Sequence, residues 1–511
     1  MSTGALVRRA ARGSTALRGG RARRLTPHQL FGLLFWLLMT LAYWRVPPCC
    51  EAAQHAAVVE RLRAGLADAT ASPYVLAQDA LARLTGLNGW QLLRVCGPLN
   101  LLVLVTGLGR LVRVLTLRPW APVLALTFVS VLWGTRPAWG GGSLALLPLT
   151  GSLGHPSAFA LGLTLWAWAL TGARARDLRP VRYVGPSGLR SLSGYMALGV
   201  VYGVVALIDP ALGVGATAGA VAFVAGWQRG WRDAVWGRWG LMCAAAAGVI
   251  AFGTHARVLP HPYGMYEAYE AHGPYDGVAG QCWLALLGVP ALWLRARRAS
   301  AQASGQTSRQ ANWRGDQRGA RRGDRVAGSA TGWAAAWRDP LVLLFAVESL
   351  LAWYGGGRHG FGELLGPALL APQCALAVEL AAERPWPGWR QVLGCATAGG
   401  ACLGFLAAQA GAVVPRSMDP VGFVQPPRWP SYDWAAQHIG PGEPVATDAY
   451  YAVRLLPGYG IELADAHDQR PRVRWLLLTR RERLPGDAVV VAWSPRTGEV
   501  LARLTRTRTY R

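Results

Sequence analysis

The residues best suited to chemistry are an acid and a histidine that follow the first apolar segment of the chain. Glu51 stands just beyond the segment Leu30 to Val46, and His55 follows four residues later. If this stretch is helical, the two side chains share one face. A carboxylate at the edge of a low-dielectric cavity can have a raised pKa and act as a general base. The simpler interpretation makes Glu51 a solvated loop acid and His55 an interfacial polar residue, and the pair alone is weak evidence for a metal.

A later segment, Arg257 to Asp276, interleaves aromatic rings with acids and histidines. This mixture suits a sugar, because rings stack on pyranose faces and carboxylates accept hydrogen bonds from hydroxyls. An aromatic belt at the membrane interface explains the composition equally well. The candidate sugar-binding residues of this loop are Arg257, His261, Tyr263 and Glu267.

Arginines and histidines near other apolar segments could hold a lipid phosphate. These candidates are Arg257, Arg358, His155 and His359. The competing explanation is that an arginine at the end of a span extends its guanidinium into the interface and binds nothing specific.

The cationic residues narrow the chemistry, because the sequence has no lysine and all 52 of them are arginines. Schiff-base, pyridoxal-phosphate and P-loop chemistry need a lysine and are excluded. Neither a Ser-His-Asp constellation nor a CxxC or HExxH motif is present, so hydrolase and zinc-protease functions have no support. The sequence assigns no cofactor with certainty, and a divalent metal remains an open alternative.

The elements that must position these residues are apolar helices. A hydrophobic content of 52% and a mean hydropathy of +0.22 exceed what a soluble domain of ordinary size carries. We expect a polytopic α-helical membrane protein with about 11 transmembrane helices. The predicted spans are Leu30–Val46, Leu92–Val114, Trp120–Trp133, Pro156–Thr171, Tyr195–Ile208, Ala211–Ala225, Leu241–His255, Val278–Leu294, Leu341–Tyr354, Leu364–Leu380 and Val392–Val414.

The arginines also predict the orientation of these spans. With a cytoplasmic amino terminus, 30 arginines fall on inner segments and 8 on outer loops and outer span ends, leaving out the carboxy-terminal tail. This asymmetry follows the positive-inside rule for a multi-pass protein of the plasma membrane. The net charge of +25 is therefore mainly a topology signal, and we expect membrane lipids and no nucleic acid as partners.

The chain divides into five parts by composition. We predict a disordered basic cytoplasmic arm, a first transmembrane part with outer loops 47–90 and 256–277, a flexible basic cytoplasmic linker, a second transmembrane part and an extracytoplasmic α/β domain. Their bounds are 1–27, 28–294, 295–339, 340–414 and 415–511. In the last part we predict a helix over Tyr432–Ile439 and strands over Glu443–Thr447, Arg474–Thr479, Ala488–Trp493 and Glu499–Leu504.

Several motifs resemble the GT-C glycosyltransferases, polytopic enzymes that use polyprenyl-phosphate sugars on the outer face of the membrane. An acid follows the first span in Cys49-Cys50-Glu51-Ala-Ala-Gln-His55, and an amphipathic outer loop comes next. Gly154-His155-Pro156-Ser157-Ala-Phe159-Ala is similar to a motif of uncharacterised actinobacterial GT-C-like proteins. Further similar segments are Ser72–Leu76, Leu81–Gly86, Leu92–Arg113, Arg338–Leu341, Tyr354–Phe361, Arg428–Tyr432, Tyr450–Tyr451 and Leu456–Gly460.

The resemblance implies a glycosyltransferase with Glu51 as its general base. It also implies a polyprenyl-phosphate sugar as donor and a lipid, a cell-wall glycan or a protein as acceptor. The family more often has Asp at this place and many members carry a second acid beside it, whereas Ala52 follows here.

Two other classes of function stay open. A membrane transporter would place ionisable groups within its spans, and Glu348 and Glu379 are the main acids of that kind, although no internal repeat is visible. A non-catalytic membrane protein with an outer binding domain would lack converging acidic and basic groups in its outer cleft.

Overall fold

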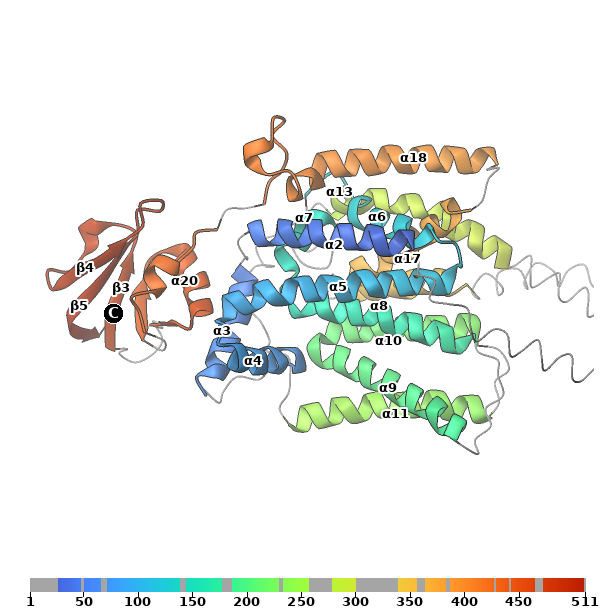
Figure 1. The fold of residues 1–511 in the computed structure, drawn as a ribbon, viewed down its shortest axis with the longest axis horizontal. Coiled ribbons are helices and arrows are strands. Elements are labelled where there is room, and N and C mark those ends of the chain that lie inside the picture. The colour runs from blue at the N-terminus through green and yellow to red at the C-terminus, as the bar shows by residue number, and fades with distance from the viewer. Residues whose placement is uncertain are drawn as a thin grey trace, which may run out of the picture.

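The protein combines a helical bundle with a small α/β domain at one end (Figure 1). The computed structural model describes residues 26–46, 50–65, 71–137, 144–176, 186–228, 233–256, 278–299, 339–355, 364–382, 387–426, 429–440, 443–464 and 472–509. We call the end of the bundle that carries the α/β domain the domain end.

Each of the eleven predicted apolar segments overlaps helical structure. The long bundle helices are α2 (Pro27–Arg45), α5 (Gly89–Leu115), α6 (Ala121–Val131), α8 (Pro156–Ala175), α9 (Pro186–Ile208), α10 (Pro210–Trp227), α11 (Asp233–His255), α16 (Pro340–Gly355), α17 (Leu365–Leu380) and α18 (Gly388–Gly404). The eighth segment is broken into α13 (Val278–Cys282), the turn η1 (Trp283–Gly288) and a helical stretch over 289–299.

Within the described ranges, four helices are long and apolar enough to cross a membrane. They are Gly89–Leu115, Pro210–Trp227, Val235–His255 and Gly388–Ala412. Four further apolar helices are shorter, namely Ala121–Val131, Leu192–Ile208, Pro340–Tyr354 and Leu365–Leu380. The fold is thus that of a helical membrane protein in which short and long helices are mixed.

Helices α2 and α5 both start at side-chain caps. Thr26 and Gln29 form a reciprocal capping box at the start of α2, and Asn88 and Gln91 form another at the start of α5. Such caps satisfy amide groups that have no partner within the helix.

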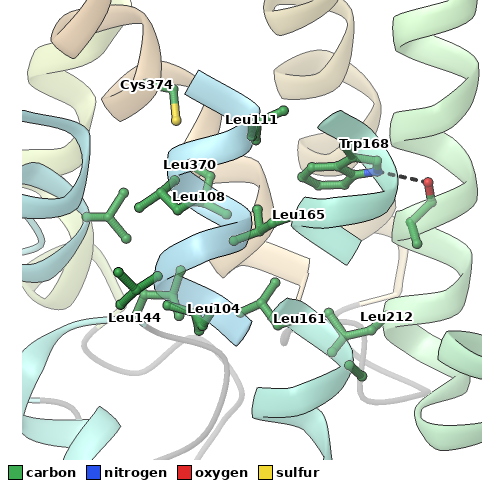
Figure 2. Close-up of a cluster of buried hydrophobic side chains, with 14 of the residues drawn as sticks. Leu104, Leu108, Leu111, Leu144, Leu161, Leu165, Trp168, Leu212, Leu370 and Cys374 are labelled. Carbon is green, nitrogen blue, oxygen red and sulfur yellow. Dashed lines mark hydrogen bonds between the residues drawn. The ribbon is translucent and has the colours of Figure 1, made fainter. Parts of the chain in front are cut away.

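The bundle core is built by close helix crossings. A Cβ added at Gly107 of α5 would lie 2.8 Å from the carbonyl oxygen of Gly162 in α8, so the two backbones touch. Trp168 of α8 lies over Gly219 of α10, and its indole Nε1 donates to the carbonyl of Ala216 at 2.9 Å (Figure 2). Small residues at such crossings are the usual device for packing helices in a membrane.

Leucines from several helices fill the space between these crossings (Figure 2). They include Leu104, Leu108, Leu111, Leu161, Leu165 and Leu370, all buried. Helix α17 lies at the centre, because every residue from Gly366 to Leu380 is buried.

Two short helices lie between α2 and α5 at the domain end. They are α3 (Cys50–Arg63) and α4 (Pro73–Thr85), in the segment predicted as an outer loop. A third short helix, α7 (Leu146–Ser152), precedes α8 and was not predicted.

The α/β domain is a five-stranded sheet with the order β2-β1-β3-β5-β4. β1 runs parallel to β2 and β3, whereas β5 runs antiparallel to β3 and β4. The strands are β1 (Pro444–Thr447), β2 (Glu462–Leu463), β3 (Arg472–Leu478), β4 (Ala488–Trp493) and β5 (Val500–Thr509). The helical elements are α19 (Asp433–Ala436), α20 (Tyr450–Leu455) and the turn η6 (Leu456–Tyr459).

The domain matches the predicted elements except in three places. The four predicted strands overlap β1, β3, β4 and β5, while β2 and α20 were not predicted. The helix predicted over Tyr432–Ile439 is only four residues long, α19.

The predicted cytoplasmic linker begins later than the sequence suggests. Residues 295–299 continue a helix, and Arg295 pairs with Asp339 at 2.9 Å. Arg298 pairs with Glu379 at 2.6 Å, and Arg390 reaches the same carboxylate at 3.2 Å. These arginines are therefore fixed by acids of the bundle. The basic arm before residue 26 and the rest of the linker, residues 300–338, lie outside the described residues.

Candidate functional site

Helix α3 carries the predicted general base to the domain end of the bundle. The backbone of Glu51 lies in the first turn of this helix, and its side chain lies outside the part of the chain that the structure describes. His55 stands one turn further along α3 and is 1% exposed. Residues 51 and 55 thus lie one turn apart on a helix, which is the arrangement in which two side chains share a face.

His55 meets a second predicted site residue, His155. The two imidazole rings are 4.2 Å apart between centroids and nearly perpendicular, at 82°. His155 is the cap of α8, where its Nδ1 accepts from the backbone N–H of Ser157 at 3.3 Å and lies 2.6 Å from the Ser157 hydroxyl. Histidines a hundred positions apart in the chain are thus neighbours at the domain end.

His155 is held in its neutral form. Burial lowers the pKa of His155 from 6.5 to about 4, because an imidazolium loses its hydration there. Since Nδ1 accepts a hydrogen bond, the single proton of the neutral ring lies on Nε2. His155 can therefore offer a hydrogen bond to a ligand, but no positive charge.

A buried polar network fixes the turn that carries His155. The hydroxyl of Tyr74 in α4 donates to Asn100 Oδ1 at 3.0 Å, and Asn100 Nδ2 donates to the carbonyl of Leu153 at 2.8 Å. The Tyr74 ring also lies 4.9 Å from the ring of Phe159. Helices α4 and α5 thereby position the histidine of α8.

The α/β domain packs against α3. Ala53 of α3 lies in the hydrophobic core of the domain, together with residues of α19, β1 and η6. Glu60 accepts a hydrogen bond from the amide of Gly89 at 2.6 Å, which ties α3 to the start of α5. Gly458 of η6 packs against the indole of Trp90, where a Cβ would lie 2.7 Å from the ring.

A cavity of about 160 Å³ lies where the domain meets the start of α5. Trp90 and Tyr459 contribute aromatic rings whose centroids are 5.7 Å apart. Arg94, Ser431 and Asp433 add charged and hydroxyl groups. Its remaining lining residues are Asn88, Gln91, Pro430 and Leu455. Rings combined with acids and amides are a lining that suits a sugar.

The other predicted binding residues lie outside the described residues. They are Arg257, His261, Tyr263, Glu267, Arg358 and His359. Of the predicted site, the structure therefore brings together the backbone of Glu51 with the side chains of His55 and His155.

Sequence reasoning did not select the cavity residues of the domain junction. Tyr459 stands in the Leu456–Gly460 motif that carried part of the family resemblance, which was a usable signal. Trp90 follows the cap residue Asn88, but nothing in its local sequence shows that η6 covers it.

The described residues contain no group of three or more His, Cys, Asp or Glu side chains that could hold a metal ion. His55 and His155 supply two imidazoles, whereas a zinc site usually has at least three protein ligands. The described part of the site thus falls short of a complete metal centre.

Comparisons with known proteins show the fold and little sequence identity. No family model matches the chain, and no curated protein matches it. ArnT from Cupriavidus metallidurans, in a crystal structure with bound undecaprenyl phosphate, is 13% identical with a TM-score of 0.50 over 93% of this chain and 97% of ArnT.

Two other solved structures match this chain with lower TM-scores. The archaeal oligosaccharyltransferase AglB from Archaeoglobus fulgidus, in complex with an inhibitory peptide and a dolichol-phosphate, is 9% identical with a TM-score of 0.46 over 88% of this chain and 69% of AglB. The arabinofuranosyltransferase AftD from Mycobacteria is 14% identical with a TM-score of 0.45 over 88% of this chain and 36% of AftD.

Proposed function

From the GT-C fold that this chain shares with ArnT, we propose that the protein transfers a sugar from a polyprenyl-phosphate donor to an extracytoplasmic acceptor. The observation that carries the proposal is the position of α3. This helix places the backbone of Glu51 one turn before the buried His55, which contacts the partly buried His155, and beside the junction with the α/β domain. The arginine asymmetry of the sequence supports an outer location of the domain end.

In the proposed reaction, Glu51 acts as the general base. The acceptor hydroxyl attacks the anomeric carbon, its proton passes to the Glu51 carboxylate, and the bond between that carbon and the phosphate oxygen breaks. The configuration at the anomeric carbon inverts and the polyprenyl phosphate leaves with the bonding electron pair. A positioned base of this kind contributes roughly 10²- to 10⁴-fold to the rate.

The histidine pair has a different part in this proposal. His155 is neutral with its proton on Nε2, so it can donate a hydrogen bond to an oxygen of the sugar or of the leaving phosphate. It does not neutralise the negative charge of that phosphate. The positive charge that stabilises the leaving phosphate then falls to arginines. Arg257 and Arg358 remain the candidates proposed from the sequence for that role.

We place the acceptor in the cavity at the domain junction. A sugar unit of a lipid or of a cell-wall glycan can stack on the rings of Trp90 and Tyr459 and hydrogen-bond to Asp433. A protein acceptor would use the same cavity for a side-chain hydroxyl. Alanines of α3 pack against Trp90 of this cavity, and His55 of the same helix contacts His155, so an acceptor in the cavity would lie near the helix that carries Glu51.

The test is sugar transfer in membrane vesicles from labelled polyprenyl-phosphate mannose or arabinose. We expect Glu51→Gln to lower the rate by two or more orders of magnitude at matched expression, because the amide cannot take the proton. Glu462→Gln on the exposed strand β2 is the matched control and should keep full activity. Equal activity of wild type and Glu51→Gln would remove Glu51 from the mechanism.

A transporter is the second candidate, and one acid supports it. Glu348 lies in the middle of α16, is fully buried, and would be 3.0 Å from a Cβ at Gly215 of α10. Within the described residues, no hydrogen bond reaches its carboxylate oxygens. Buried acids inside a span often mark the path of a transported solute. Vesicles that transfer no sugar from any donor but take up a solute, with uptake lost in Glu348→Gln, would favour this function.

A further inference from the structure

The segment that links the bundle to the α/β domain is a compact loop rather than an extended tether. We call residues 413–426 the connector; it begins where the last bundle helix ends at Ala412. The carboxylate of Asp419 accepts from the amides of Val421, Gly422 and Phe423 at 2.7 to 3.1 Å. It also accepts from Gln425 Nε2 at 2.9 Å. These bonds close the loop on itself.

The closed loop presents two apolar side chains outward. Met418 is 74% exposed and Val421 is 72% exposed. Large apolar side chains with that exposure are costly in water, yet here they stand on a hydrogen-bonded loop next to the end of a membrane helix. Exposed apolar side chains are stabilised where they insert into the head-group region of a lipid bilayer.

A cavity of about 270 Å³ lies between the connector and the end of α2. Its apolar wall includes Ala42, Val46 and Val414, and its polar rim includes Arg45 and Arg416. Both arginines are exposed, and one amino group of Arg416 donates to the carbonyl of Pro426 at 3.0 Å. An apolar wall with a cationic rim matches an amphiphile with an anionic head.

No carboxylate side chain that the structure describes neutralises the charge of this rim. Within the described ranges, no carboxylate forms an ion pair with Arg45 or Arg416. The acid nearest to Arg416 in sequence, Asp419, already accepts four hydrogen bonds inside the connector. Desolvation raises the pKa of Asp419, but these hydrogen bonds outweigh it and lower the pKa. Two arginines at a membrane surface attract the head groups of anionic lipids.

We propose that the cavity between the end of α2 and the connector binds the phosphate of an anionic phospholipid head group. The lipid phosphate lies between the Arg45 and Arg416 guanidinium groups, while Met418 and Val421 enter the head-group layer beside it. The occupant belongs to the leaflet at the domain end, and it fixes the connector and hence the place where the domain begins. This lipid is a structural partner and is distinct from the sugar donor.

The experiment uses the full chain in nanodiscs of phosphatidylcholine with a minor fraction of phosphatidylglycerol. Native mass spectrometry after release from the disc measures how many molecules of each lipid stay bound to the protein. We expect one phosphatidylglycerol to be retained in preference to phosphatidylcholine. In Arg45→Gln/Arg416→Gln, that preference should fall by about tenfold or more.

Three further variants make the result specific. Arg61→Gln removes an exposed arginine of α3 that does not line the cavity, and it should keep the preference. Met418→Ser/Val421→Ser should weaken retention of both lipids. Arg45→Gln alone tests the head-group contact if the double variant does not fold, because Arg45 is exposed on the last turn of α2.

Three outcomes would overturn the proposal. One is retention of phosphatidylglycerol that does not depend on Arg45 and Arg416. Another is displacement of the lipid by inorganic phosphate alone, which would make the cavity a free-anion site. The third is one-for-one displacement by undecaprenyl phosphate, which would assign the cavity to the donor. None of these outcomes depends on sugar transfer, so the test is independent of the proposed activity.

Discussion

At the scale of single residues, the burial of the His155 imidazole makes the stability of the fold depend on pH. Its pKa in the folded protein is about 4, below the value near 6.5 of an exposed histidine. Between these values the unfolded chain binds a proton that the folded chain does not, so stability rises with pH through this window and is complete above it. Acidification from pH 7 to pH 5 should cost about 2 kcal/mol, because the slope approaches about 1.4 kcal/mol per pH unit below pH 6.5.

This prediction can be measured as the Tm of the purified protein in detergent between pH 7 and pH 5. The decrease in Tm should be smaller in His155→Gln, because glutamine does not titrate. His438, which is exposed in the α/β domain, provides the control variant His438→Gln, and its pH dependence should follow wild type. Identical curves for wild type and His155→Gln would show that His155 titrates normally.

The sequence singled out His55 and His155, but not their contact. Both are polar residues near the ends of apolar segments, which makes them candidates by residue type. Their contact depends on how α3 folds back over the cap of α8, and that in turn depends on the Tyr74 and Asn100 network. No local pattern encodes a packing arrangement of this kind, whereas a cap or a span is encoded by its neighbours.

At the scale of helices, the crossing of α8 and α10 leaves no room for a larger residue at Gly219. A Cβ at Gly219 would overlap the indole of Trp168, which is fully buried and hydrogen-bonded to the next helix. We therefore expect Gly219→Ala to destabilise the protein by about 1 to 3 kcal/mol through overpacking. Thermal unfolding in detergent measures the effect.

Gly248 supplies a matched control within α11. A Cβ there meets no atom within 4 Å, so Gly248→Ala gains helix propensity without a clash. Its Tm should stay equal to wild type or rise slightly. If both alanine variants lost the same stability, the loss would come from glycine replacement in general and not from the α8–α10 crossing.

Helix existence was predictable, whereas helix length was not. Apolar runs of sufficient length place a helix at every predicted span, because a membrane leaves the backbone few other ways to satisfy its polar groups. Helices α9 and α11 begin nine and eight residues before their predicted spans, whereas α17 agrees with its predicted span to one residue. α17 is enclosed by the bundle, and its Gln373 donates to the carbonyl of Leu132 just after α6. The sequence predicts α3 only conditionally: Glu51 and His55 share a face if the segment is helical.

At the scale of the whole molecule, the contact between η6 and Trp90 couples the domain to the bundle. A Cβ at Gly458 would lie 2.7 Å from the indole, so Gly458→Ala should push the domain away from α5. We expect the KM for the acceptor to rise by about tenfold, a loss of about 1.4 kcal/mol in acceptor binding, while the KM for the donor changes little.

Kinetics of sugar transfer with varied acceptor measure this effect, and Gly486→Ala is the control. Gly486 lies in the same domain with no atom within 4 Å of an added Cβ, so its variant should keep the wild-type KM. A Gly458→Ala enzyme with unchanged KM for the acceptor would place acceptor binding away from the domain junction.

The division of the chain into five parts is a prediction from composition, because a stretch rich in Arg and Gly separates two groups of apolar segments. How the tail docks did not follow. The docking depends on η6, α20 and one face of α3, and these elements are too short for their hydrophobic periodicity to be distinctive.

Helix α3 belongs to two folding units at once, and this has a consequence for biosynthesis. Ala53 completes the core of the α/β domain, while His55 two residues later touches the bundle. Because synthesis runs from the amino to the carboxyl end, the ribosome makes α3 long before the β-strands of the domain. A nascent chain therefore carries Glu51 through the whole of membrane insertion without the wall that the domain supplies. Under the proposed function, the acceptor side of the site forms only after the α/β domain has been made, so a chain truncated before that domain would lose the acceptor cavity.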